Sequence, residues 1–87
     1  MNAITEIRLT AHAAQMTRRR EIELTWIEDT LRNPTAQRAD ERDPSLKLSF
    51  RKIEQAGGKW LRVVYRMDNF THLVVTAFFD RNQEKRK

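Results

Sequence analysis

The spacing of the apolar residues changes halfway along the chain, and this change constrains the fold more than any other feature. Leu24, Ile27 and Leu31 recur at helical spacing, whereas the apolar residues of the stretch 46–50 alternate with polar ones. Helical spacing gathers side chains on one face of a helix, and alternation gathers them on one face of a strand. Helices followed by strands are typical of an α+β domain with a mainly antiparallel sheet.

Caps, breakers and turns predict where the individual elements begin and end. Thr10 is a suitable N-cap for a helix that runs to about Arg19, and Asn33-Pro34 ends a second helix predicted over 23–32. Ala56-Gly57-Gly58-Lys59 is typical of a hairpin turn. The remaining elements are expected to be strands at 46–51, 60–66 and 73–79, with an optional edge strand at 36–39. Residues 4–9 are expected to form a short first strand or an extended lead-in.

We expect a single domain over residues 1–79. Its two N-terminal helices should pack on one face of a small sheet of three to five strands. Apolar residues make up 39% of the chain, below the roughly 45–50% that is usual for globular proteins. The core should therefore be small, and the charged residues 80–87 are expected to form a frayed tail.

The positive charge is concentrated in one stretch of the sequence. Residues 45–66 hold six basic side chains and one acidic side chain, which equals the net charge of +5 of the whole chain. A localised basic field favours a polyanionic partner such as nucleic acid. The alternatives are an acidic protein partner, or a solvated strand face kept basic to discourage edge pairing.

Alternation predicts that the basic residues share the sheet face that the helices leave uncovered. The side chains expected on that face are Lys47, Ser49, Arg51, Arg62 and Arg66, with Trp60 and Thr76 among them. Their cations would bind phosphate, and Trp60 would stack on a base or pack at the sheet edge. Tyr65 is expected in the core, in phase with Leu61 and Val63, and His72 is expected to be exposed at a turn.

Several classes of site are not expected. The chain has no cysteine, no glycine-rich phosphate loop, no HExxH motif and no zinc-ligand spacing, so we expect neither a metal site nor a cofactor. No apolar run is long enough to span a membrane, and the first six residues do not resemble a signal peptide. We therefore expect a cytoplasmic protein that does not bind membranes.

Five short motifs follow one another between residues 4 and 79. They are Leu9-Thr10-Ala11-His12-Ala13, Arg20 with Ile22, Thr30-Leu31-Arg32-Asn33-Pro34, Gly58-Lys59-Trp60-Leu61-Arg62-Val63-Val64 and Val74-Val75-Thr76-Ala77-Phe78. In this order and spacing they resemble the small bacterial domains of unknown function that are grouped with the BrnT and RelE toxins of toxin–antitoxin pairs. Glu21 departs from the glycine that is frequent there in the family, and Met16 departs from a common basic residue.

The resemblance implies a RelE-like fold, a cognate antitoxin protein as partner, and an RNA substrate that is free or on the ribosome. Toxins of that group cut RNA without metal, by attack of the 2′-hydroxyl on the neighbouring phosphate. Such a reaction needs a proton acceptor, a proton donor and cations near the phosphate. The expected function is therefore a toxin-like endoribonuclease of a type II toxin–antitoxin module.

His12, Arg20 and Arg51 are the candidate catalytic residues. His12 would act as a general acid or base, or instead bond the start of the first helix or pack against the sheet. Arg20 matches the family arginine and would clamp a phosphate, or tie the corner between the helices to the sheet. The alternative to an enzyme is a non-catalytic module that binds nucleic acid or an acidic protein. A third possibility is an interaction protein whose exposed strand edge pairs with a partner.

Overall fold

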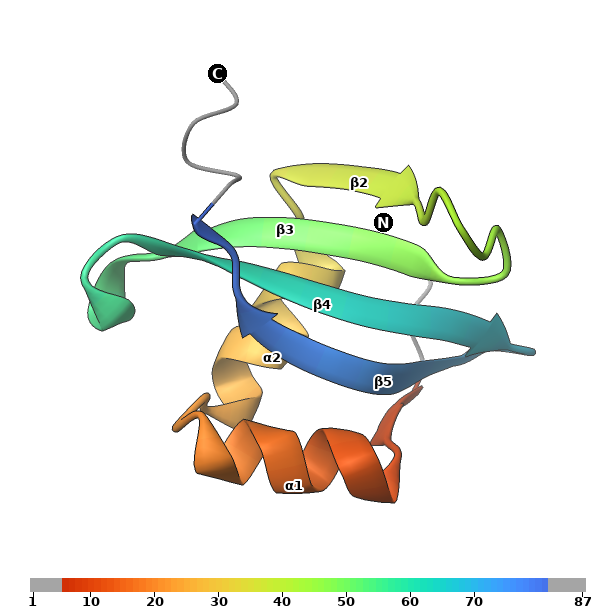
Figure 1. The fold of residues 1–87 in the computed structure, drawn as a ribbon, viewed down its shortest axis with the longest axis horizontal. Helices are drawn as coiled ribbons and strands as arrows, with labels where there is room; N and C mark the ends of the chain where they lie inside the picture. Colours follow the sequence, from red (N-terminus) through yellow and green to blue (C-terminus); the bar gives the residue numbers. More distant parts are fainter. Residues whose placement is uncertain (1–5, 82–87) are drawn as a thin grey trace.

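A computed structural model describes residues 6–81 of the chain. The elements follow the expected order (Figure 1): β1 (Glu6–Leu9), α1 (Ala11–Arg19), α2 (Leu24–Arg32), β2 (Ala36–Ala39), β3 (Lys47–Ile53), a 3-10 helix (Glu54–Ala56), β4 (Lys59–Asp68) and β5 (Thr71–Phe79). The optional edge strand is present as β2, and both α-helices lie where they were predicted. Residues 4 and 5 of the first predicted strand lie outside the described residues.

The five strands form one mixed sheet in the order β1-β5-β4-β3-β2. β1 runs parallel to β5, and the other neighbouring strands are antiparallel. The α+β class is thus confirmed, with one parallel pair at the β1 edge. Not every helix is N-terminal, because the short 3-10 helix lies in the connection between β3 and β4.

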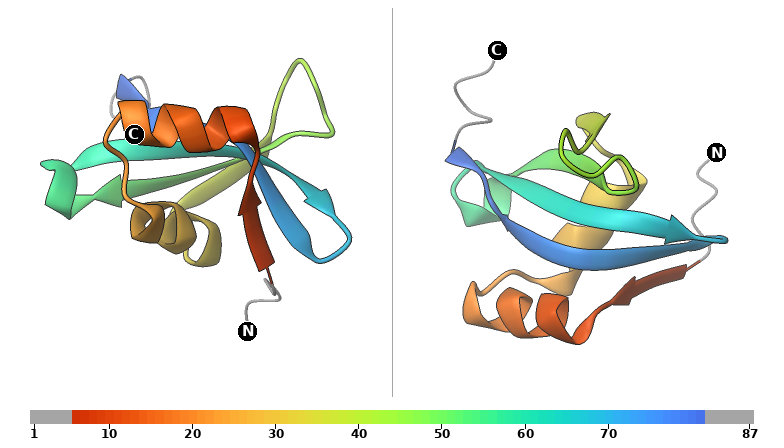
Figure 2. Two further views of the ribbon diagram at one scale, coloured as in Figure 1. Left: turned by 90° about the horizontal axis from the view of Figure 1, so that it is seen from below. Right: turned by 45° about the vertical axis from the view of Figure 1, so that its right-hand side comes forward.

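The two α-helices occupy different places relative to the sheet. Figure 2 shows α2 across one face, whereas α1 runs alongside β5 at its outer edge. The Thr10 hydroxyl accepts a hydrogen bond from the Ala13 backbone N–H at 3.0 Å, which caps α1 as predicted. Both helices contribute to one core with the strands; its buried residues are Ala13, Ile22, Ile27, Leu31, Ile53, Leu61, Val63, Tyr65, Val74 and Ala77.

The expected grouping of the basic residues on one face is wrong. Arg62 is paired with Phe50, whereas Arg51 is paired with Leu61. Paired residues point to the same face, and neighbours along a strand point to opposite faces. Arg51 therefore lies on the helix side with Leu61, as do Lys47 and Ser49, which precede it in β3 at alternate positions. Arg62 and Arg66 lie on the face that α2 leaves uncovered.

The error has a physical cause in the apolar residues of β3. Leu48 and Phe50 were taken to face the helices, but they form a second small cluster with Val64 on the uncovered face. Both faces of β3 are thus partly buried, and alternation alone does not say which face the helices cover. The connection from the 3-10 helix through Gly58 sets the register, with Ile53 opposite Lys59.

The described chain stays part of the fold beyond β5. The Asp80 backbone N–H donates to the Trp60 carbonyl at 2.8 Å, and the Asp80 carboxylate is 7% exposed. Asp80 was expected at the start of a frayed tail and is instead buried; residues 82–87 of that tail lie outside the described residues. Among residues 6–81, no helix is long and apolar enough to cross a membrane.

Candidate functional site

A row of alternating guanidinium groups and phenyl rings crosses the uncovered face of the sheet. We call it the arginine–aromatic ladder; in spatial order its members are Arg38, Phe50, Arg62, Phe78 and Arg20. The guanidinium carbons lie 4.8 Å (Arg38) and 5.1 Å (Arg62) from the centre of the Phe50 ring. They lie 5.4 Å (Arg62) and 5.8 Å (Arg20) from the centre of the Phe78 ring. The row joins β2, β3, β4, β5 and the C-terminal end of α1.

The ladder explains how the uncovered face is buried without a second layer of helices. Phe50 is only 1% exposed, although α2 lies on the other side of the sheet. Arginine stems cover apolar surface while their charged ends stay in water, and guanidinium groups are attracted to the faces of aromatic rings. Arg20 and Arg38 remain exposed. The face therefore combines an apolar floor with outward positive charge.

Arg62, in the middle of the ladder, is paired with Asp80. Its Nη2 lies 2.6 Å from the Asp80 Oδ2, and the two side chains are 22% and 7% exposed. The pair is thus only partly accessible to water. Because Asp80 neutralises Arg62, the outward charge of the ladder comes from its ends, Arg20 and Arg38.

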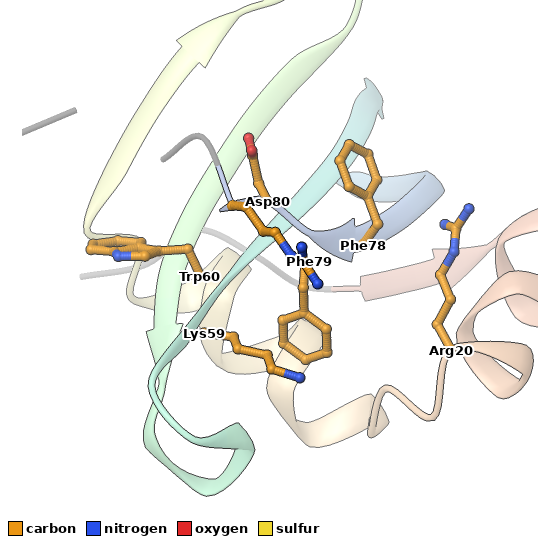
Figure 3. A pocket seen from close by; sticks show the side chains of 7 residues that line it. Arg20, Lys59, Trp60, Phe78, Phe79 and Asp80 are labelled. Carbon is orange, nitrogen blue, oxygen red and sulfur yellow. The ribbon is translucent and has the colours of Figure 1, made fainter. Parts of the chain in front are cut away.

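A cleft of about 550 Å³ opens where β4 begins and β5 ends. We call it the β4–β5 cleft; its lining residues are Arg20, Lys59, Trp60, Phe78, Phe79, Asp80 and Arg81. Trp60 and Arg20 lie on opposite sides of it (Figure 3). The Lys59 Nζ lies 5.6 Å from the centre of the Phe79 ring. The cleft thus has aromatic walls, three cations and one carboxylate, which suits a flat, negatively charged ligand.

Arg20 has a structural contact and also faces the cleft. Its Nη1 donates to the Ala77 carbonyl at 2.8 Å and to the Thr76 hydroxyl at 3.4 Å. Both acceptors belong to β5, so the side chain ties the corner after α1 to the sheet. The two interpretations of Arg20 are compatible in this geometry.

The three candidate catalytic residues do not meet. The Arg51 Nη1 donates to the Asn33 carbonyl at 2.7 Å, on the helix side of the sheet at the end of α2. His12 is exposed in the first turn of α1. It lies about 12 Å from Arg20 along the helix, because each residue rises 1.5 Å. Of the predicted phosphate and base contacts, the uncovered face brings together Trp60, Arg62 and Arg66; Lys47 lies on the helix side.

His72 differs from the expectation of an exposed turn residue. It is 9% exposed, because β1 pairs with β5 and places Ile7 opposite it. Its ring stacks on Tyr65 with centroids 5.0 Å apart. Burial lowers the pKa of His72, and the charge of Arg32 lowers it further. Nothing local in the sequence indicates this burial, since the parallel pairing joins segments more than sixty residues apart.

Sequence reasoning also missed three members of the ladder. From the sequence, Phe50 and Phe78 were expected to be ordinary core residues, and Arg38 lies in a strand that was predicted only as optional. The signal that was available is the spacing of aromatic and basic residues on paired strands, but it becomes visible only once the register is known. Within residues 6–81, no cluster of three or more histidine, aspartate or glutamate side chains has the geometry to hold a metal ion.

A family model described as a domain of unknown function, DUF4258, matches residues 9–79. The match covers more than half of the chain, and the chain therefore belongs to this family. No curated protein matches the chain, and no solved structure does. Because the family description names no activity, the function has to be inferred from the site.

Proposed function

We propose that this member of the DUF4258 family is a binding module for single-stranded RNA, and that the RNA strand lies across the uncovered face of the sheet. The observation that carries the proposal is the arginine–aromatic ladder, with its apolar floor and exposed cations. Open sheet faces with aromatic and basic side chains can stack bases and hold phosphates without reading a duplex.

The ladder supplies the phosphate contacts. Guanidinium groups present a planar fork of N–H donors that matches phosphate oxygens. Neighbouring strands lie about 4.8 Å apart, so the row from β2 to β5 spans roughly 14 Å. That length exceeds the spacing of successive phosphates on one strand, about 3.4 Å along a helical axis. Arg38 and Arg20 at its two ends would contact different phosphates.

The β4–β5 cleft supplies the base contact. Trp60 is partly exposed at its rim, and Phe78 and Phe79 form its wall. A volume of about 550 Å³ falls within the roughly 300–1,000 Å³ of typical small-ligand sites. Stacking of one base on an aromatic side chain contributes about 1–3 kcal/mol. A nucleobase in the cleft would leave its phosphate near Lys59, Arg81 and Arg20.

A second proposal is the toxin-like endoribonuclease with a RelE-like fold, acting in the cytoplasm and neutralised by an antitoxin. The observation that favours it is the Asp80 carboxylate beside Arg62 in the cationic cleft. There, Asp80 would accept the proton of the 2′-hydroxyl as its oxygen bonds to phosphorus, and Arg20 would stabilise the charge on the phosphate oxygens. The bond from phosphorus to the 5′-oxygen would break, and Lys59, which also lines the cleft, would donate a proton to that leaving oxygen. Neither His12 nor Arg51 lines this cleft, so this version replaces the expected catalytic set.

Binding is tested with a fluorescent single-stranded RNA and fluorescence anisotropy at several salt concentrations. Arg38→Gln should weaken binding and reduce the slope of log affinity against log salt by about 0.7, the value for one phosphate contact on a single strand. Arg8→Gln is the matched control, because Arg8 carries the same charge and lies on β1, at the opposite edge of the sheet. Equal loss in both variants would contradict the proposal.

Two further arms separate the alternatives. A polyglutamate peptide that binds as tightly as RNA, and loses affinity equally in Arg38→Gln, would favour an acidic protein as the partner. Incubation of the wild-type protein with RNA in a chelator, followed by electrophoresis, tests cleavage. New RNA ends that are absent with Asp80→Asn would support the endoribonuclease. Intact RNA under conditions of full binding would support a binding module that does not cleave RNA.

A further inference from the structure

The outer edge of β1 carries backbone groups that no strand of the described chain pairs. β1 lies at one end of the sheet, so only β5 is its neighbour within residues 6–81. The Thr10 N–H donates to the Val74 carbonyl at 3.0 Å, and the backbone groups of successive residues point to opposite sides of a strand. Ile7 and Leu9 therefore direct their N–H and C=O groups away from β5, where a further strand can pair with them.

An apolar groove runs beside this edge, on the helix side of the sheet. Its volume is about 220 Å³, and its lining residues are Ile7, Leu9, Leu24, Ile27 and Glu28. Leu24, the first residue of α2, is 59% exposed. α2 packs mainly against β3 and β4, and this position leaves Ile7 and Leu9 half-buried. An apolar surface beside an unpaired strand edge is typical of a site at which another chain adds a strand.

The charged side chains of β1 point to the other face and are complementary to those of a second β1. Glu6 and Arg8 are both exposed, with 2.8 Å between the Arg8 Nε and the Glu6 Oε2. In an antiparallel pair with Ile7 opposite its own copy, Glu6 lies opposite Arg8 of the second copy, and Arg8 lies opposite Glu6. Opposite charges on directly opposed residues stabilise a strand pair, and like charges destabilise it. A parallel pair in the same register would oppose each charge to its own copy, so the charges favour the antiparallel arrangement.

We propose that two copies of this chain pair through β1 in antiparallel orientation, about a two-fold axis that passes beside Ile7. Each Ile7 N–H then donates to the Ile7 carbonyl of the second copy, because Ile7 is one of the residues that face outward. The two Ile7 side chains lie together on the helix side, where each Leu24 shields them from water. The same surface contacts itself, as in the commonest symmetry of soluble oligomers. α1 begins at Ala11, beyond the paired residues, and therefore does not lie between the two strands.

The proposed axis determines how the two copies present their other surfaces. Paired residues of neighbouring strands point to the same face of a sheet, so both helix layers lie on one side of a continuous sheet. Both arginine–aromatic ladders lie on the other side. One RNA strand would contact two ladders; this consequence rests on the proposed function, whereas the dimer itself does not. Because β1 has four residues, the contact is small, and the dimer should dissociate to monomers in dilute solution.

Sedimentation velocity of the full chain tests the dimer between low micromolar concentration and about 0.5 mM. The average mass should rise from 10.4 kDa toward twice that value. Glu6→Arg should raise the dissociation constant about tenfold, because it places like charges opposite each other at two symmetric positions. Glu6→Arg combined with Arg8→Glu should restore most of the affinity, since the two charges exchange places and remain complementary.

Two further variants complete the test. Glu41→Arg makes the same change of charge in the exposed loop between β2 and β3, at the other end of the sheet, and should leave the dissociation constant unchanged. Leu24→Lys should weaken the dimer and keep the fold, because Leu24 is mostly exposed. Circular dichroism checks the folding of each variant.

Three results would overturn the proposal: a folded monomer at every concentration, a dimer that neither Glu6→Arg nor Leu24→Lys weakens, or a combined variant that dimerises no better than Glu6→Arg alone. The RNA titration is read separately. RNA binding by a chain that stays monomeric rejects the dimer and keeps the proposed function. A dimer that binds no RNA keeps the pairing and rejects the proposed function.

Discussion

Arg62 and Asp80 join the start of β4 to the residue that follows β5, with 2.6 Å between the Arg62 Nη2 and the Asp80 Oδ2. Their pairing couples the stability of the domain to the ladder, because Arg62 also lies between the rings of Phe50 and Phe78. A buried charge that loses its partner costs more than the pair itself contributes.

Asp80→Asn should lower the free energy of unfolding by about 1–3 kcal/mol. This range is below the 3–5 kcal/mol typical of a fully buried pair, because water still reaches Arg62. Urea denaturation followed by circular dichroism measures the change. The control is Glu6→Gln, which breaks an exposed ion pair with Arg8 and should leave the midpoint unchanged. Equal midpoints for wild type and Asp80→Asn would show that the Arg62 charge needs no partner.

Stability should fall as the pH is lowered below about 6.5, in part because of His72. Burial and Arg32 lower the pKa of His72 in the folded protein, so protonation favours the unfolded state, in which the pKa is near 6.5. The contribution is fully present above that unfolded value and is lost as the pH falls through the folded pKa. His72→Phe keeps an aromatic ring against Tyr65 and should reduce the loss of stability between pH 7.5 and pH 5.5.

Urea denaturation at pH 7.5, 6.5 and 5.5 checks this, together with NMR titration of the His72 ring. His12→Gln is the matched control, because it removes a histidine that is exposed in the first turn of α1. The change in pH dependence caused by His72→Phe should exceed the change caused by this control. A His72 ring that titrates above 6.5 in the folded protein would contradict the prediction.

Local signals in the sequence predicted the helices and strands. Long-range strand pairing determines which side chains share a face and which are buried, and the sequence did not predict that pairing. Thr10 and Asn33-Pro34 mark helix ends through their own backbone chemistry, so the helices could be placed from the sequence. Arg51 could not be placed, because its face depends on the register of β3 against β4. His72 could not be placed either, because its burial depends on the parallel pairing with β1.

Thr10→Ala should lower the free energy of unfolding by about 1 kcal/mol, the usual value of an N-cap side chain. The Thr10 hydroxyl accepts from the Ala13 N–H at 3.0 Å, and alanine leaves that donor without this acceptor. Thr25→Ala, at an exposed position in α2, controls for the loss of a threonine and should change stability little. Differential scanning calorimetry measures both variants. If Thr25→Ala lowered the free energy of unfolding as much as Thr10→Ala, capping would not explain the effect of Thr10→Ala.

RNA should quench the fluorescence of Trp60 and not that of Trp26. Trp60 lines the β4–β5 cleft, whereas Trp26 packs against Phe79 from α2, with ring centroids 6.2 Å apart. Trp26→Phe and Trp60→Phe each leave one indole, so the two variants report on the two positions separately. A titration with single-stranded RNA should quench only Trp26→Phe, and Trp60→Ala should weaken binding by about 1–3 kcal/mol, one stacked base. Quenching of Trp60→Phe alone would place the base elsewhere.

Arg51 and Arg38 should separate stability from RNA binding. The Arg51 Nη1 donates to the Asn33 carbonyl on the helix side, so Arg51→Met should make unfolding easier by about 1 kcal/mol, the net value of one hydrogen bond. It should leave RNA affinity within about twofold, because the guanidinium does not face the proposed RNA surface. Arg38→Met should weaken RNA binding and leave the free energy of unfolding nearly unchanged. Arg38 is exposed on an edge strand, and its charge lies at one end of the ladder. Urea denaturation and fluorescence anisotropy on the same two variants provide the comparison. A loss of RNA affinity in Arg51→Met that equals the loss in Arg38→Met would mean that RNA contacts the helix side, and the ladder would not be the binding surface.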